Sequence, residues 1–142
     1  MLTDIGFFDP DFGSYCEDVD LSWRAQLAGY RCVYVPSAVL YHKVSATGSG
    51  PIRSFFVARN TIWTLVKNLP AGVWRRHRAE IVAAQWHRFL DAARAWRGRA
   101  ARATIRGQVA ALRGLPRMLA KRRLIPAGRR VDDAYVESLL IP

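Results

Sequence analysis

Two neighbouring carboxylates, Glu17 and Asp18, are the residues of this sequence whose type and spacing best suit chemistry. They stand where a loop meets an expected helix, a place in which the partial positive charge of the helix N-terminus favours acidic side chains. A carboxylate held there can remove the proton of a hydroxyl group, which is general base catalysis. From the residues alone, the favoured interpretation is that the two charges only stabilise the helix N-terminus.

The elements around this pair are predicted to alternate between helix and strand. Acidic residues in the first turn and a glycine stop, Gly29, predict a helix over 17–28. Residues 30–37 alternate and are rich in β-branched and aromatic side chains, which predicts a strand, and 38–44 is expected to be a second extended segment. A helix follows from Pro51 up to the next proline at position 70. We therefore expect an α/β fold for residues 1–70.

The rest of the chain, 71–142, is predicted to be a basic helical extension. Residues 1–50 hold three basic and six acidic residues, whereas 51–142 hold 19 basic and five acidic ones. A last short helix is expected over 132–140. The helical pieces before it are predicted to be divided at Gly107, Gly114, Pro116 and Pro126.

This extension has three interpretations that the residues leave open. Trp, Phe and Leu on one side and Arg on the other are typical of a helix that lies on an anionic membrane. The basic face could instead dock on another part of the same protein. Binding to nucleic acid ranks lowest, because no known nucleic-acid motif accompanies the charge.

Cysteine usage and hydropathy favour the cytoplasm. Cys16 and Cys32 do not form a secreted disulfide framework and are expected to be buried apolar residues. No apolar run is long enough to span a membrane, and no signal peptide is recognised, so membrane contact would be peripheral, on the inner face. The opening run MLTDIGFFDPDF looks like the interior of a domain, and we expect the chain to be a fragment.

Several elements in a fixed order resemble the second half of the GT-A domain of family 2 glycosyltransferases, especially bacterial rhamnosyltransferase-like members. The resemblance is clear over residues 1–70. The basic extension shares only its general character with the family. The matching elements are GFFDPDF (6–12), the ED pair (17–18), DLSWR (20–24), AGYR (28–31), VPSA (35–38) and His42, followed more loosely by RNTIW (59–63) and KNLP (67–70).

The resemblance implies an inverting enzyme with a partial GT-A fold and Asp18 as its general base. Glu17 would bind acceptor hydroxyls or hold Asp18 in place. A divalent cation, manganese or magnesium, would neutralise the nucleotide diphosphate, held mainly by an upstream DxD motif that is absent here and also by His42. The donor would be a nucleotide sugar, with rhamnose favoured by the resemblance alone. The acceptor would be a glycan or a lipid-linked glycan of the cell envelope.

Three further residues bear on the same site. Arg59 lies on the apolar stripe of its helix, so we expect it to reach a partner, the diphosphate or the acceptor. Asp9 and Asp11 form a DxD look-alike in a turn and are not expected to bind the metal. This segment alone is expected to be inactive. The alternative function is a non-catalytic basic helical module that binds an anionic membrane or nucleic acid.

Overall fold

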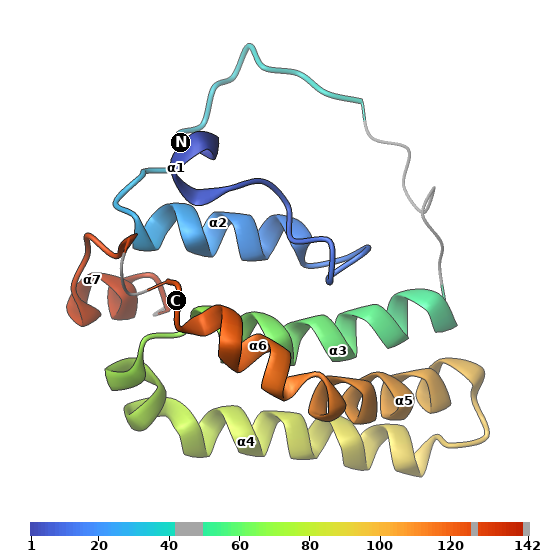
Figure 1. Cartoon of the computed structure of the whole chain (residues 1–142). Coiled ribbons are helices and arrows are strands. Elements are labelled where there is room, and N and C mark those ends of the chain that lie inside the picture. The colour runs from blue at the N-terminus through green and yellow to red at the C-terminus, as the bar shows by residue number, and fades with distance from the viewer. Residues whose placement is uncertain (42–49, 126–127, 141–142) are drawn as a thin grey trace.

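The computed structural model describes residues 1–41, 50–125 and 128–140 of the 142-residue chain. Within these ranges every regular element is a helix, and there are seven of them (Figure 1). In chain order they are α1 (Leu2–Ile5), α2 (Glu17–Leu27), α3 (Pro51–Asn68), α4 (Ala71–Arg94), α5 (Arg99–Arg113), α6 (Leu115–Arg122) and α7 (Asp133–Ser138).

The prediction of an α/β fold is wrong for the part of the chain that the structure describes. Residues 30–41, expected to supply strands, pass above α2 as an irregular segment with no ladder partner among the described residues (Figure 1). Alternation of β-branched and aromatic residues only favours a strand, because the backbone N–H and C=O groups of a strand must pair with a neighbouring strand. The described chain is therefore not an α/β GT-A fragment. The apolar side chains of this segment are exposed: Val33, Tyr34, Val35, Val39, Leu40 and Tyr41.

The predicted helices are confirmed where their end signals are strong. Helix α2 begins at Glu17 with three acidic residues in its first turn, and α3 begins with Pro51 at its first position. Helix α7 is capped by Asp132, whose carboxylate accepts a hydrogen bond of 2.8 Å from the backbone N–H of Tyr135. These are local signals, so the sequence alone locates them.

Helix α3 lies at the centre of the molecule and packs closely against α5. Their approach depends on Gly107, since a Cβ atom there would lie 2.3 Å from the carbonyl oxygen of Phe55. The prediction that Gly107 divides the helix is wrong: α5 runs through it, because this glycine serves helix packing. The division before α5 falls instead at residues 95–98.

Two hydrophobic clusters lie on either side of α3. The first joins the loop before α2 to α3, α5 and α6, and the second joins α2, α3, α4 and α7. Trp23 packs against the second cluster. The buried members are Phe12, Trp63, Ala111 and Met118 in the first cluster, and Leu27, Leu69, Val73 and Val136 in the second.

The two cysteines have different environments. Cys16 is half-buried and Cys32 is exposed, and both are free thiols. The expectation of two buried cysteines is wrong for Cys32, because it lies in the irregular segment that covers no core. Among the described helices, none combines the length and apolar character needed to cross a membrane.

Candidate active site

Asp18 is an exposed carboxylate in the first turn of α2. One of its oxygens accepts a hydrogen bond of 2.8 Å from the backbone N–H of Val19. This contact leaves the side chain open to solvent. Glu17 is half-buried, and its buried Oε2 atom has no hydrogen-bond partner among the described residues. The adjacent pair thus offers one accessible carboxylate and one recessed carboxylate.

The loop that leads into this pair is strained. Tyr15 and Cys16 both adopt positive φ angles, 67° and 63°, a left-handed conformation that residues with a side chain rarely occupy. Such residues each cost roughly 1–3 kcal/mol and persist only where surrounding contacts hold them. The backbone therefore reaches Glu17 through a conformation that other parts of the molecule must enforce.

Asn60 of α3 supplies much of that restraint. Its buried side-chain amide donates hydrogen bonds to three loop carbonyls, those of Phe12 at 2.9 Å, Ser14 at 2.9 Å and Tyr15 at 2.6 Å. One side chain thus satisfies three backbone acceptors that enter the interior without regular secondary structure. The N-terminus of α2, and with it Asp18, is fixed relative to α3.

Arg59 lies beside this amide and holds the same loop. Its Nη2 atom donates to the carbonyl oxygens of Asp11 at 3.1 Å and Phe12 at 2.8 Å. Its guanidinium also lies over the ring of Trp63, 4.2 Å from the centroid, a cation–π arrangement. Burial lowers the pKa of Arg59, although nearby Asp11 opposes that shift. In this structure Arg59 contacts the loop before the carboxylate pair.

A buried ion-pair network fixes the other side of α2. Asp20 is fully buried and accepts hydrogen bonds from Lys67 at 2.9 Å and from Asn68 at 2.8 Å. Asp20 also pairs with Arg24, one turn further along α2, at 3.0 Å, and this pair is largely buried. Arg24 also donates to the backbone carbonyl of Phe7 at 2.6 Å. These contacts tie α2 to α3 and to the segment after α1.

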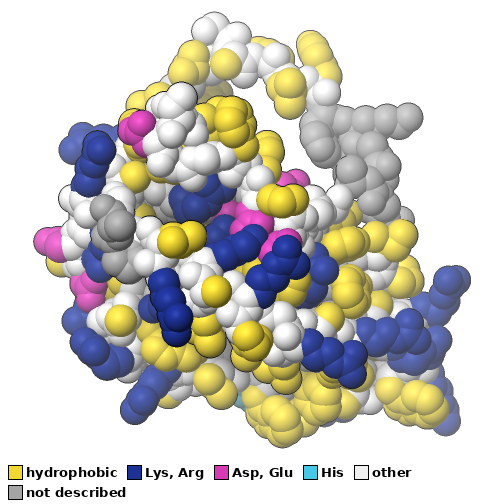
Figure 2. Space-filling model, in the orientation of Figure 1, with side chains coloured by type: hydrophobic (Ala, Val, Ile, Leu, Met, Phe, Trp, Pro, Cys, Tyr) yellow, Lys and Arg dark blue, Asp and Glu magenta, His cyan; other side chains and the backbone are white. Residues whose placement is uncertain are grey.

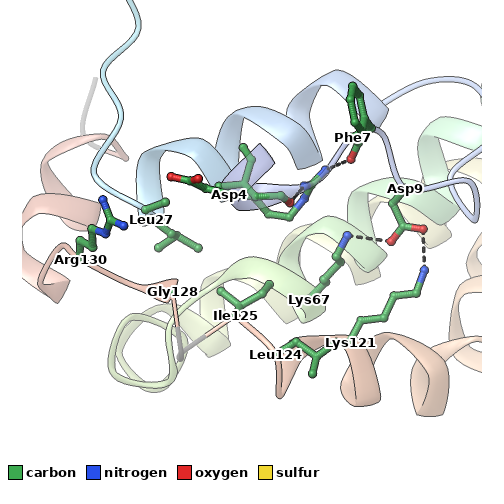
Figure 3. Close-up of a pocket in the computed structure, with 13 residues that line it drawn as sticks. Asp4, Phe7, Asp9, Leu27, Lys67, Lys121, Leu124, Ile125, Gly128 and Arg130 are labelled. Atoms are coloured by element: carbon green, nitrogen blue, oxygen red, sulfur yellow. Dashed lines mark hydrogen bonds and ion pairs between the residues drawn. The ribbon is translucent and has the colours of Figure 1, made fainter. Parts of the chain in front are cut away.

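The look-alike pair Asp9 and Asp11 belongs to the same network, and Figure 3 shows Asp9 between Lys67 and Lys121. Asp9 pairs with Lys67 at 2.7 Å and with Lys121 of α6 at 2.5 Å, while Asp11 pairs with Lys121 at 2.6 Å and with Arg117. Burial opposes ionisation of Asp9, but the contacts with Lys121 and Lys67 outweigh it and hold the pKa of Asp9 at about 2. Basic residues of the extension thus neutralise acidic residues of the first fifty.

A pocket of about 480 Å³ lies beside this network (Figure 3). Neither the carboxylate pair at 17–18 nor Arg59 lines it. The charged groups in its wall that take part in the network are already neutralised by one another. The pocket therefore gives no independent chemistry. Its lining includes Asp9, Arg24, Lys67 and Lys121 together with apolar side chains such as Ile5, Leu27 and Leu124.

The described residues do not fit a divalent metal by themselves. In the ranges described, no group of three or more His, Cys, Asp or Glu side chains is placed to hold an ion. Asp9 and Asp11 are paired with lysine and arginine, whose positive charge disfavours the binding of a cation. His42, the predicted ligand, lies outside the described residues.

Two residues of the site, Asn60 and Lys67, were not identified from the sequence. Both are polar residues within an otherwise apolar helical stripe, one position after Arg59 and one before Asn68. A polar residue on such a stripe is buried only if it finds partners, and these two find theirs in the 9–20 region. The motifs RNTIW and KNLP contained this signal.

The candidate site consists of a solvent-open carboxylate at a helix start and a loop before it that Arg59 and Asn60 hold. A family model described as "Glycosyl transferase family group 2" matches residues 1–117. The chain belongs to this glycosyltransferase family. The match includes α4 and α5 and so extends past residue 70.

Two curated relatives are similar to part of the chain. Both carry the name N-acetylglucosaminyl-diphospho-decaprenol L-rhamnosyltransferase, from Mycobacterium tuberculosis strains CDC 1551 / Oshkosh and ATCC 25618 / H37Rv. Each is 39% identical over 72 residues, which is 50% of this chain and 24% of the relative. The chain thus matches about a quarter of the length of these relatives. No solved structure matches it significantly.

Proposed function

We propose that this chain forms the acceptor-activating part of an inverting glycosyltransferase, with Asp18 as its general base. One observation carries the proposal. Asp18 is open to solvent, whereas Asp9, Asp11 and Asp20 are held in ion pairs. A general base must reach a substrate proton, and Asp18 has the accessibility that this requires.

The proposed step transfers one proton and one glycosyl group. The acceptor hydroxyl gives its proton to the Asp18 carboxylate as its oxygen forms a bond to the anomeric carbon of the donor. The bond from that carbon to the diphosphate breaks, and its electron pair leaves with the nucleoside diphosphate. Attack from the face opposite the leaving group inverts the configuration. Asp18 ends the step protonated and returns its proton to solvent.

Glu17 is proposed to bind acceptor hydroxyl groups. The alternative is that Glu17 holds the neighbouring Asp18 in place, since its buried Oε2 atom is closed to a substrate. Asn60 and Arg59 are proposed as positioning residues, since both hold the loop that sets the direction of the α2 N-terminus. A direct contact of Arg59 with the diphosphate or the acceptor stays a prediction.

The substrates are proposed from the relatives. Their printed name describes a transferase of L-rhamnose to a diphospho-decaprenol carrying N-acetylglucosamine. For this chain we propose a nucleotide-sugar donor, with a deoxysugar such as rhamnose favoured, and a glycan or lipid-linked acceptor of the cell-envelope type. Dependence on manganese or magnesium and a role of His42 in holding the ion are also proposals. The proton transfer to Asp18 does not involve the metal.

The test is sugar transfer by the transferase that contains this segment, measured with a nucleotide-sugar donor. Asp18→Asn preserves the shape but removes the base, so kcat should fall by about 10² to 10⁴ with little change in donor affinity. The matched control is Asp132→Asn, which alters another exposed aspartate at a helix start. A kcat for Asp18→Asn close to that of this control would overturn the assignment.

A further inference from the structure

An apolar groove of about 530 Å³ runs between α3, α4 and α5. It lies apart from the carboxylate pair and from the ion-pair network, and none of those residues lines it. Trp86 and Phe89 stack at its edge with ring centroids 5.3 Å apart and an interplanar angle of 20°. Its lining is almost wholly apolar: Ile62, Leu65, Val66, Trp74, Ile81, Val82, Trp86, Phe89, Ile105, Val109, Leu112 and Leu115, with Gln85 and Gln108.

The outer edge of this groove is open to solvent. Val82 is 58% exposed, Trp86 57% and Leu112 61%, and Val109 is exposed as well. Isolated exposed apolar residues are ordinary in proteins. A contiguous group that includes an aromatic pair instead marks a surface that binds an apolar partner. We call the four residues Val82, Trp86, Val109 and Leu112 the α4–α5 face.

The charges beside the α4–α5 face are all positive. On α4, Arg78 stands four residues and Arg75 seven residues before Val82, so both arginines share its side of the helix. Arg106 and Arg113 share the side of Val109 on α5 in the same way, and all four arginines are exposed. Figure 2 shows hydrophobic side chains along the lower edge, where α4 and α5 lie, with Lys and Arg beside them.

The acidic residues of these helices lie elsewhere. Glu80 and Asp91 are the acidic residues of α4. Glu80 stands two positions before Val82 and Asp91 five positions after Trp86, and at about 100° per residue both spacings turn the side chain to a different side of the helix. Residues 99–122, which form α5 and α6, contain no Asp or Glu. The face therefore combines an apolar strip with an unopposed positive potential, and the complementary partner is apolar and anionic at once.

We infer that the α4–α5 face docks on the surface of an anionic lipid bilayer. Trp86 and its apolar neighbours would enter the boundary between headgroups and acyl chains, and the arginines would contact lipid phosphates. A second copy of this chain fits less well, because it would bring arginine against arginine. Nucleic acid would leave the apolar groove without a partner. This inference does not depend on sugar transfer.

The basic extension contains three tryptophans, Trp74, Trp86 and Trp96. The structure separates them, since Trp74 is half-buried against the second hydrophobic cluster. Trp96 is 59% exposed but lies in the connection between α4 and α5. Trp86 is the tryptophan at the centre of the open edge and is the one to test.

The experiment is co-sedimentation of the 142-residue chain with vesicles of phosphatidylglycerol and phosphatidylcholine, or of phosphatidylcholine alone. The apolar variant replaces Trp86 and Leu112 with Ser. The charge variant replaces Arg75, Arg78, Arg106 and Arg113 with Gln. Its matched control makes the same change of charge away from the face, at the exposed residues Arg31, Arg53, Arg94 and Arg123. Circular dichroism verifies that each variant remains helical.

The wild-type chain should bind the anionic vesicles, and high salt should release part of it. The charge variant and the apolar variant should each bind the anionic vesicles at least about tenfold more weakly than the wild type. The control should bind nearly as the wild type does. Equal losses in the charge variant and its control would overturn the inference in favour of non-specific attraction. The inference would also be overturned if the wild type did not bind vesicles or if the apolar variant bound them unaltered. A wild-type dimer that the apolar variant no longer forms, seen by size-exclusion chromatography, would overturn it as well.

Discussion

The Nδ2 atom of Asn60 donates a hydrogen bond of 2.6 Å to the carbonyl oxygen of Tyr15, a residue 45 positions away in the sequence. This contact, made just before Glu17, connects the central helix to a loop whose backbone is strained. Local sequence would not hold that loop in its left-handed conformation, because Tyr and Cys gain nothing from it. A side chain of α3 therefore determines how the carboxylate pair is presented.

Asn60→Ala should lower the free energy of unfolding by about 2–3 kcal/mol, because buried carbonyl groups lose their donor. Urea denaturation followed by circular dichroism measures the change. Arg53→Ala, at an exposed position of the same helix, is the control and should stay within about 0.5 kcal/mol of the wild type. If both variants unfold at the same urea concentration, the amide does not hold the loop.

In the transferase that contains this segment, Asn60→Ala should also reduce kcat more than it changes the KM of the donor. The reason is that a released loop leaves Asp18 intact but poorly aimed. The pH profile distinguishes this role from that of a base: Asn60→Ala should keep the acidic limb that Asp18→Asn removes. Loss of that limb in Asn60→Ala would contradict a positioning role.

Gly107→Ala should destabilise the fold by about 1–3 kcal/mol, measured as the shift of the urea midpoint. Alanine in a helix interior is intrinsically better than glycine by about 1 kcal/mol, but the new Cβ would collide with the Phe55 carbonyl of α3. The clash should outweigh the propensity. Gly128→Ala is the control, since its Cβ would meet nothing within 4 Å and should have little effect. A stabilised Gly107→Ala variant would show that α3 and α5 are not in close contact.

Asp20→Ala should cost about 3–5 kcal/mol of unfolding free energy, because it removes one of the two carboxylate partners of the buried Lys67 and also the acceptor of Arg24 and Asn68. The control is Asp91→Ala, which breaks an exposed pair with Arg94 and should cost less than about 1 kcal/mol. Chemical denaturation of both variants measures the two losses of unfolding free energy. Similar small losses would mean that the network around Asp20 is solvated and not structural.

Stability should fall in acid, and Asp9 should account for part of the fall. Its folded pKa, about 2, lies below the ordinary value of 3.8, so its ionisation contributes stability above pH 4 that is lost as the pH drops towards 2. Asp9→Asn should be less stable than the wild type at pH 6, and the difference should shrink between pH 4 and pH 2. A difference that stays constant over this range would exclude Asp9 as a source of the pH dependence.

The sequence by itself determined the features that depend on neighbouring residues. Acidic first turns, prolines and the Asp132 cap locate the helices that begin at Glu17, Pro51 and Asp133, because such signals act within one turn. The order of motifs also indicated the family, which the family model confirms over residues 1–117. The division of the chain at residue 70 stays a prediction.

Tertiary structure decided what depends on distant partners. The 30–37 pattern favoured a strand, but a strand exists only with a paired neighbour, and the described residues offer none. Gly107 looked like a helix break and proved to be the place where two helices touch. The same dependence on partners explains why Asp9 and Asp18, two aspartates of one acidic region, differ so much: lysines of α3 and α6 reach the first, and solvent reaches the second.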